Sequence, residues 1–219
     1  MINYIRQFQI PSSIRGYLVT CYRTSRNSLI KLLLFLRGTS EEVIYVDPRT
    51  IKRTISRFDP ALIHRQYRHF GSVSSGDWDL NGYEIKRYGG IYPILKQIFD
   101  GNSYDNITLF QDNLSYIEMG GKPDNCRTTD AYREKWKKIE ILYNQIKQGG
   151  YKNQHELRTG LKFEEIRVQI ARNGELLFEE GIHRLVIAQL LQLKCIPVMI
   201  TRRHSDAVNT DINRMNLAQ

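Results

Sequence analysis

The sequence predicts an α/β fold with a small mixed sheet, and three observations support this class. An apolar run at 43–46 has the length of a buried strand, and apolar residues between 130 and 148 recur at helical spacing. Residues 165–200 then have the pattern of a hairpin, a short glycine-containing loop, an apolar helix and a last strand. Strands that alternate with helices in one chain are typical of a sheet with helices packed on it.

Residues 1–40 predict a basic helical extension, with a helix near 28–36 and Gly38 as its stop signal. This segment has six basic residues and no acidic one. Four interpretations stay open: contact with nucleic-acid phosphates, attachment to a membrane surface, a transit peptide, or ordinary solvated surface before a buried helix. The apolar stretch at 29–36 is short and contains a lysine, so no transmembrane segment is expected.

A domain with a large insertion is expected over residues 41–206, followed by a C-terminal tail at 207–219. The first strand ends at Asp47-Pro48, and over the insertion, about 56–129, glycine, asparagine, aspartate and serine interrupt short apolar groups. Residues 72–125 contain eight acidic and four basic residues, so this region differs in charge from the basic first segment. Its aromatic residues provide material to pack: Tyr83, Tyr88, Tyr92, Phe99, Phe110 and Tyr116.

Regular elements return at residue 130. Residues 165–170 alternate as a strand does, and Asn173-Gly174 predicts a hairpin turn to a return strand at 176–178. An apolar helix at 185–191 and a strand at 196–200 follow. The helix before the hairpin is marked by residues at helical spacing: Trp136, Ile139, Leu142, Tyr143 and Ile146.

The segment at 179–184, Glu-Glu-Gly-Ile-His-Arg, points most clearly to chemistry because it joins a short strand to the start of an apolar helix. The backbone N–H groups and the positive dipole end at a helix start both favour an anion. A glycine, Gly181, stands beside this helix start, and His183 and Arg184 add donor or cationic side chains to the first turn. The pattern therefore predicts a phosphate-binding site.

Cysteine and histidine usage predicts a cytoplasmic protein and indicates no metal site. Cys21, Cys126 and Cys195 are odd in number, widely spaced and outside any Cys-x-x-Cys motif, which is typical of reduced thiols. His64 and His69 are five residues apart, which misses the one-face spacing of a helical metal-binding pair.

The order of these elements resembles the ParB/sulfiredoxin superfamily. The likeness is carried by Tyr45-Val46-Asp47-Pro48 with Ile51, by 139–146 followed by Gly149-Gly150-Tyr151, and by 176–200. It implies a ParB/sulfiredoxin-like core formed by about 41–55 and 130–206, with the insertion between them. In that superfamily a Gly-x-His/Arg-Arg box binds nucleotide phosphate at a helix start.

Carried over to this chain, the resemblance implies a role for each residue of the box. Gly181 would allow close backbone approach, while His183 and Arg184 would hold a phosphate together with Glu179 and Ile182. Arg184 is the stronger ligand, because its planar guanidinium can bind two phosphate oxygens at once. His183 could be a neutral donor or a titrating group.

Departures from the family narrow the expected chemistry. Sulfiredoxins have a nucleophilic cysteine where this chain has Ile182, so sulfinic-acid reduction is not expected. ParB partitioning proteins continue into a helix-turn-helix domain, for which the 15 residues after His204 leave no room. The box is closest to that of ParB-like free-serine kinases. This likeness implies ATP or another nucleotide with Mg²⁺, and phosphoryl transfer to a small-molecule acceptor.

Three carboxylates are candidates for catalysis. Asp77 could bind Mg²⁺ or a substrate hydroxyl, or could belong to a surface turn around a half-buried tryptophan. Glu180 adjoins the box as a base or metal ligand, and since successive residues of a strand face opposite ways, only one of Glu179 and Glu180 is expected to point into the site. Asp47 follows a strand, where aspartate before proline is usually a turn former.

Arg203 is a further candidate for the phosphate or for a second anion, or it belongs to a basic strand end on the surface. The leading hypothesis is a nucleotide- or phosphate-binding protein that serves as an ATP-dependent phosphotransferase. The alternatives are a ParB-like nucleic-acid-binding protein that uses residues 1–68, with or without nuclease activity, and a non-catalytic nucleotide-sensing protein.

Overall fold

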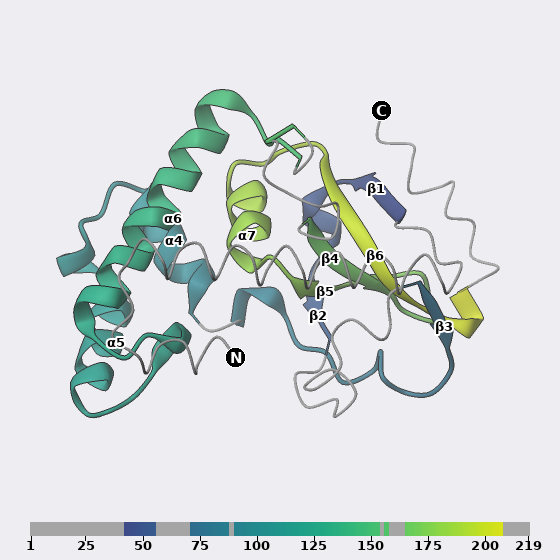
Figure 1. Cartoon of the computed structure of the whole chain (residues 1–219), viewed down its shortest axis with the longest axis horizontal. Coiled ribbons are helices and arrows are strands. Elements are labelled where there is room, and N and C mark those ends of the chain that lie inside the picture. The colour runs from purple at the N-terminus through teal and green to yellow at the C-terminus, as the bar shows by residue number, and fades with distance from the viewer. Residues whose placement is uncertain (1–41, 56–70, 88–89, 154–155, 158–164, 208–219) are drawn as a thin grey trace, which may run out of the picture. The chain divides into compact units, whose positions relative to one another are not determined.

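The computed structural model describes residues 42–55, 71–87, 90–153, 156–157 and 165–207 (Figure 1). The chain divides into two compact units, 1–41 and 42–219, and only the second contains described residues. The expected basic extension, His64, His69, Cys21 and the tail after residue 207 lie outside the described ranges. Most of the surface expected to contact nucleic acid, 1–68, also lies outside them.

Six strands form one mixed sheet, which confirms the expected α/β fold. The strands are β1 (Glu42–Val46), β2 (Arg53–Thr54), β3 (Ser72–Ser74), β4 (Ile166–Ile170), β5 (Leu176–Glu180) and β6 (Ile196–His204). Their order is β1-β6-β4-β5-β2, and β3 pairs with the second half of β6. β4 and β3 run parallel to β6, and β2 runs parallel to β5, whereas the β1–β6 and β4–β5 pairs are antiparallel.

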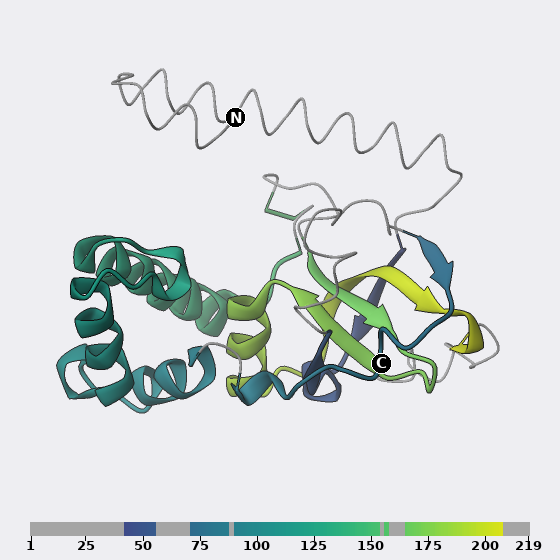
Figure 2. The same ribbon diagram turned by 90° about the horizontal axis from the view of Figure 1, so that it is seen from below.

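Four α-helices accompany the sheet in the described ranges: α4 (Ile91–Phe99), α5 (Thr108–Glu118), α6 (Thr129–Gly149) and α7 (Ile182–Leu190). Short 3₁₀ turns connect them: η1 (Pro48–Thr50), η2 (Ile85–Arg87), η3 (Tyr104–Asn106), η4 (Pro123–Asn125) and η6 (Ser205–Ala207). α7 lies between the sheet and the group of α4, α5 and α6 (Figures 1 and 2). Among these described helices, none is both long and apolar enough to cross a membrane.

One hydrophobic core joins the sheet to all four helices. Ile166, Val168 and Ile170 alternate along β4 with the polar residues Arg167 and Gln169, so their side chains share one face and pack on the helices. Aromatic side chains from α5 and α6 fill the middle of the helical group, and the rings of Phe110 and Tyr132 lie 5.1 Å apart between their centroids. Helices α4 and α5, which lie within the expected insertion, are therefore part of the main core.

Two β-bulges flank Val168 in the centre of the sheet. Between β4 and β5, Arg167 lies opposite Glu180 and Val168 lies opposite Phe178, so Glu179 is an extra residue. Between β4 and β6, Val168 lies opposite Ile200 and Gln169 lies opposite Arg202, so Thr201 is likewise an extra residue. The bulges interrupt the simple alternation of side chains at these positions.

The two ends of the sheet differ in the segments that connect the strands. At one end, which we call the α7 end, β5 leads through Gly181 into α7, and β1 finishes opposite the start of β6. At the other end, the hairpin end, residues 171–175 connect β4 to β5. The two ends are separated by the five residues of β5, or about 15 Å.

Candidate functional site

Gly181 forms the turn from β5 to α7, as the sequence predicts. Its φ of 99° is in the left-handed region, and a Cβ added there would lie 3.2 Å from the Cα of Ile166. Glycine avoids both the backbone strain and this contact. No side chain caps α7, whose first intrahelical hydrogen bond is donated by the Leu185 N–H to the Gly181 carbonyl oxygen at 3.1 Å. The helix start therefore has the anion-binding character of an uncapped N-terminus.

The Arg184 guanidinium lies beside this helix start. Its Nη2 would be 3.5 Å from a Cβ at Gly181, and its Nη1 is 3.8 Å from Oε2 of Glu165. The Glu165 side chain is only 3% exposed, so the arginine compensates a buried carboxylate. Tyr151 adjoins the pair, and burial is the main cause that raises the pKa of its hydroxyl to about 12. Arg184 is thus held in one position by its neighbours.

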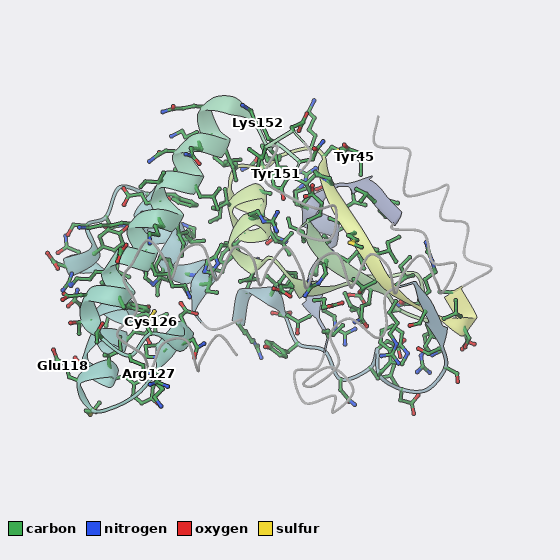
Figure 3. The ribbon with its side chains drawn as sticks, in the orientation of Figure 1. Tyr45, Glu118, Cys126, Arg127, Tyr151 and Lys152 are labelled. Atoms are coloured by element: carbon green, nitrogen blue, oxygen red, sulfur yellow. The ribbon has the colours of Figure 1, made fainter. Side chains whose placement is uncertain are left out.

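A pocket of about 500 Å³ opens beside Arg184, in the size range of small-molecule sites. Figure 3 shows Tyr151 and Lys152 where the chain leaves α6, next to the upper end of this helix. No carboxylate is among the described residues that line the pocket, whereas Lys152 and Arg184 are cationic. The lining residues are Leu142, Gln145, Ile146, Gln148, Gly149, Gly150, Tyr151, Lys152, Leu157 and Arg184.

His183 has different surroundings and does not line this pocket. Burial is the main cause that lowers its pKa to about 4, with a further lowering by Lys135 that Asp124 opposes. The imidazole is therefore neutral at pH 7, and its Nε2 has no hydrogen-bond partner among the described residues. The structure brings Arg184, but not His183, to the pocket beside α7.

Glu179 and Glu180 both contact Arg167, in contrast to the expected alternation. Glu179 accepts hydrogen bonds from Arg167 Nε at 3.2 Å, from Gln169 Nε2 at 3.1 Å and from the Thr201 hydroxyl. Glu180 forms an ion pair with Arg167 Nη2. The bulge at Glu179 explains why adjacent carboxylates bind the same arginine. Glu179 is 7% exposed and its carboxylate is fully engaged, while Glu180 is 58% exposed.

Asp47 lies away from Gly181. The two residues follow β1 and β5, which are three strand positions apart, or about 14 Å. The Asp47 carboxylate accepts hydrogen bonds from the backbone N–H and the guanidinium of Arg49, and the guanidinium is the main cause that lowers its pKa. Asp47 therefore caps the turn η1, as aspartate before proline usually does.

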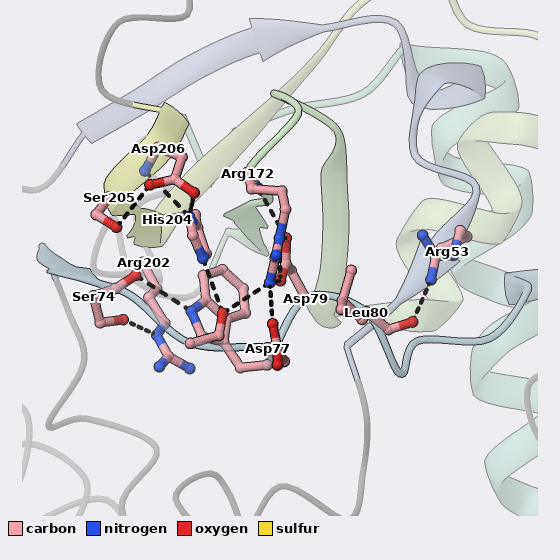
Figure 4. Close-up of polar contacts among 12 residues, drawn as sticks. Arg53, Ser74, Asp77, Asp79, Leu80, Arg172, Arg202, His204, Ser205 and Asp206 are labelled. Carbon is pink, nitrogen blue, oxygen red and sulfur yellow. Dashed lines mark hydrogen bonds and ion pairs between the residues drawn. The ribbon is translucent and has the colours of Figure 1, made fainter.

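Asp77 and Arg203 lie toward the hairpin end of the sheet. Asp77 Oδ1 is 2.8 Å from Nη2 of Arg172, in the turn between β4 and β5 (Figure 4). Arg203 lies opposite Ile170, the last residue of β4. Ile182 stands at the start of α7, but its side chain is buried in the core. The predicted site residues are thus divided among several places, and Arg184 and Gly181 meet at one of them.

Comparison of the chain with models of protein families, with curated proteins and with solved structures gives no match. The resemblance to the ParB/sulfiredoxin superfamily stays a prediction.

A second polar cluster lies at the hairpin end, and its residues come from two segments far apart in the sequence, so no local sequence signal marks it. The Arg202 guanidinium lies 4.1 Å from the centroid of the Trp78 ring, and His204 Nε2 is 2.9 Å from the Gly76 carbonyl oxygen. The Asp206 N–H donates to His204 Nδ1 at 3.1 Å, and the Asp206 carboxylate lies 3.5 Å from the same nitrogen. Figure 4 shows these contacts tying the loop at 74–79 to the end of β6.

The carboxylates near the start of α7 do not fit a Mg²⁺ site. Glu165 is bound by Arg184, and Glu180 is bound by Arg167. Within the described ranges, no three His, Cys, Asp or Glu side chains gather into a group that could hold a metal ion. A nucleotide fits better, since Arg184, Lys152 and two glutamine amides line the pocket.

Proposed function

We propose that the protein binds a phosphate-bearing small molecule, and specifically a nucleotide, in the pocket beside Arg184. One observation carries this proposal: the same guanidinium lies at the uncapped start of α7 and in the wall of a pocket of about 500 Å³. The ligand's phosphate would receive hydrogen bonds from Arg184 and from the backbone of the first helical turn.

The other lining residues of the pocket could contact the base of a nucleotide. Leu142, Ile146 and Leu157 offer apolar contact, and Gln145 and Gln148 can donate to and accept from polar ring atoms. Lys152 supplies a second cation at the end of α6. We also propose a cytoplasmic location, in keeping with the free thiols of Cys126 and Cys195.

The surroundings of the site favour binding over phosphoryl transfer. A kinase needs a group that positions or deprotonates the acceptor hydroxyl. Glu165 and Glu180 are both held by arginines, and Asp77 is bound by Arg172. The non-catalytic alternative, a nucleotide-sensing protein, is therefore the form of the proposal that these contacts support best.

A thermal-shift series tests the proposal with ATP, ADP, CTP and inorganic phosphate, each with and without Mg²⁺. A nucleotide should raise the melting temperature of the native chain by mass action. Loss of Arg184 alone would leave Glu165 buried without its cation, so the test variant is the double substitution Glu165→Gln with Arg184→Gln. Arg127→Ala is the control, because Arg127 is exposed and lies far from Tyr151 in Figure 3.

The nucleotide shift should disappear in the double variant and persist in Arg127→Ala. No shift of the native chain with any of these compounds would overturn the proposal, as would an equal shift in the double variant.

A further inference from the structure

A second pocket, of about 340 Å³, lies at the other end of α7. Gln189 of α7 lines it, seven residues after Ile182 and about 10 Å farther along the helix. The lining residues are Arg49, Ile51, Lys52, Glu84, Ile85, Lys86, Tyr92 and Gln189. None of these residues lines the pocket of Arg184, so the two pockets are distinct.

Hydrogen bonds between separate segments fix the walls of this second pocket. The Gln189 side-chain amide donates to the carbonyl oxygens of Pro48 and Ile51, both at 2.9 Å. The Ile85 N–H donates to the Lys52 carbonyl oxygen, also at 2.9 Å. These bonds join α7, η1 and η2, so the pocket is formed before any ligand arrives.

The pocket has one aromatic wall, Tyr92. Ile51 and Ile85 line the pocket but are almost fully buried in the main core, at 0% and 2% exposure, so the Tyr92 ring is the aromatic surface that a ligand can reach. The Tyr92 ring stands beside them at the start of α4, with Lys86 Nζ 5.7 Å from its centroid. A planar apolar group can stack on a tyrosine ring at this kind of site.

The rim of the pocket is cationic, with three basic residues against Glu84. Arg49 is already bound by Asp47 at 2.6 Å, and Glu84 lies 4.0 Å from Arg87. Across the described ranges, neither Lys52 nor Lys86 forms an ion pair with a carboxylate. Two ammonium groups beside a pocket with an aromatic wall favour an anionic ligand.

We propose that this second pocket binds a small aromatic anion. Its ring lies against Tyr92, and its phosphate or carboxylate is bound by Lys52 and Lys86. Charge-assisted hydrogen bonds to the two ammonium groups orient the ligand. This site is separate from the nucleotide site proposed above and does not depend on it.

The test is a ligand-detected NMR titration with phenyl phosphate and with benzoate, which distinguish a phosphate from a carboxylate preference. Phenol and inorganic phosphate are the matched controls that carry only the ring or only the charge. The titration uses the full chain with Glu165→Gln and Arg184→Gln, so that binding at the other pocket does not contribute. At least one aromatic anion should bind more tightly than either control.

Lysine variants then locate the binding. The pair Lys52→Gln and Lys86→Gln should weaken binding of the aromatic anion about tenfold or more, since two charge-assisted contacts are lost. The pair Lys137→Gln and Lys138→Gln removes the same charge from the exposed surface of α6 and should leave binding unchanged. Because all four lysines are partly or fully exposed, we expect these variants to fold.

Absence of binding by both aromatic anions would overturn the proposal. Equal weakening by the two lysine pairs would also overturn it, because the anion would then respond to net charge alone. An unchanged affinity for the aromatic anion in the Lys52→Gln and Lys86→Gln variant would also overturn the proposal.

Discussion

His183 and Arg184 are neighbours in the sequence, yet their charges differ because their surroundings differ. Arg184 faces the buried Glu165 carboxylate, whereas burial is the main cause that lowers the pKa of His183 and leaves it neutral. Successive residues of a helix point about 100° apart, so adjacent side chains reach different neighbours. Spacing in the sequence could identify both residues, but their neighbours come from α6, from η4 and from the residue before β4, and they depend on the tertiary fold.

The protein should lose stability as the pH falls from 6.5 to 4, because His183 is protonated in the unfolded chain but not in the folded one. The folded-state pKa of His183, about 4, lies below the ordinary 6.5, so the unfolded chain binds the proton more readily as the pH falls through this window. The loss should approach about 1.4 kcal/mol per pH unit. Urea unfolding of the native chain and of His183→Gln at pH 7 and pH 5 measures it. An NMR titration that places the His183 pKa near 6.5 would contradict this prediction.

Asp79 and Asp77 bind the same arginine but should differ in their contribution to stability. Asp79 is 2% exposed and accepts from the Arg172 backbone N–H at 2.9 Å and from its guanidinium, whereas Asp77 is 76% exposed. Asp79→Asn should cost about 2–3 kcal/mol in the free energy of unfolding, because hydrogen bonds to a charged group are lost. Asp77→Asn should cost about 0.5 kcal/mol or less. If urea unfolding gave the same loss of unfolding free energy for both variants, the difference in burial between Asp79 and Asp77 would not determine their contributions to stability.

The contact between Asp79 and Arg172 should also make the stability of the protein depend on pH in acid. Burial opposes ionisation of Asp79, but the hydrogen bonds from Arg172 outweigh it and lower the pKa to about 2. The resulting stabilisation is complete above the ordinary pKa of 3.8 and is lost as the pH falls through about 2. Unfolding curves measured from pH 5 to pH 2 should therefore fall less steeply for Asp79→Asn than for the native chain.

At the scale of elements, local signals in the sequence located most of the regular structure near the candidate site. Asn173-Gly174 marks the hairpin, and the strand expected at 176–178 lies within Leu176–Glu180. β6 continues to His204, beyond the expected end at residue 200. Its second half is polar and pairs with β3, whose three residues carry no strand signal of their own. The bulges at Glu179 and Thr201 could not be predicted from the sequence either, since they depend on how the strands pair.

Gly181 connects β5 to α7, and its replacement should be more harmful than that of Gly76. Both glycines have a φ near 98°, but a Cβ would meet Ile166 only at Gly181 and would meet nothing within 4 Å at Gly76. Gly181→Ala should lower the free energy of unfolding by about 1–3 kcal/mol, through backbone strain and the contact with Ile166. Gly76→Ala should lower it through backbone strain alone. Thermal unfolding of both variants gives the comparison. A smaller loss for Gly181→Ala would mean that the Ile166 contact relaxes without cost.

At the scale of the whole molecule, the main hydrophobic core of the described residues joins the sheet to α4, α5, α6 and α7. Composition indicated an insertion with aromatic residues to pack, but it could not show where they would pack. Phe110 and Trp136 belong to the same cluster as Val168 and Ile187, from the sheet and from α7. We therefore expect helices α4–α6 and the sheet to unfold together.

Phe110→Ala tests this shared core, because Phe110 is fully buried in α5, outside the sheet. Loss of the ring should cost about 3–5 kcal/mol through lost burial and a residual cavity. In a cooperative unit, hydrogen exchange of the β4 and β6 amides should accelerate by the same free energy as exchange of the α6 amides. Tyr116→Ala, at an exposed position of the same helix, should change neither. Acceleration confined to α4–α6 would instead mean that these three helices unfold as a unit of their own and that the sheet and α7 are stable without them.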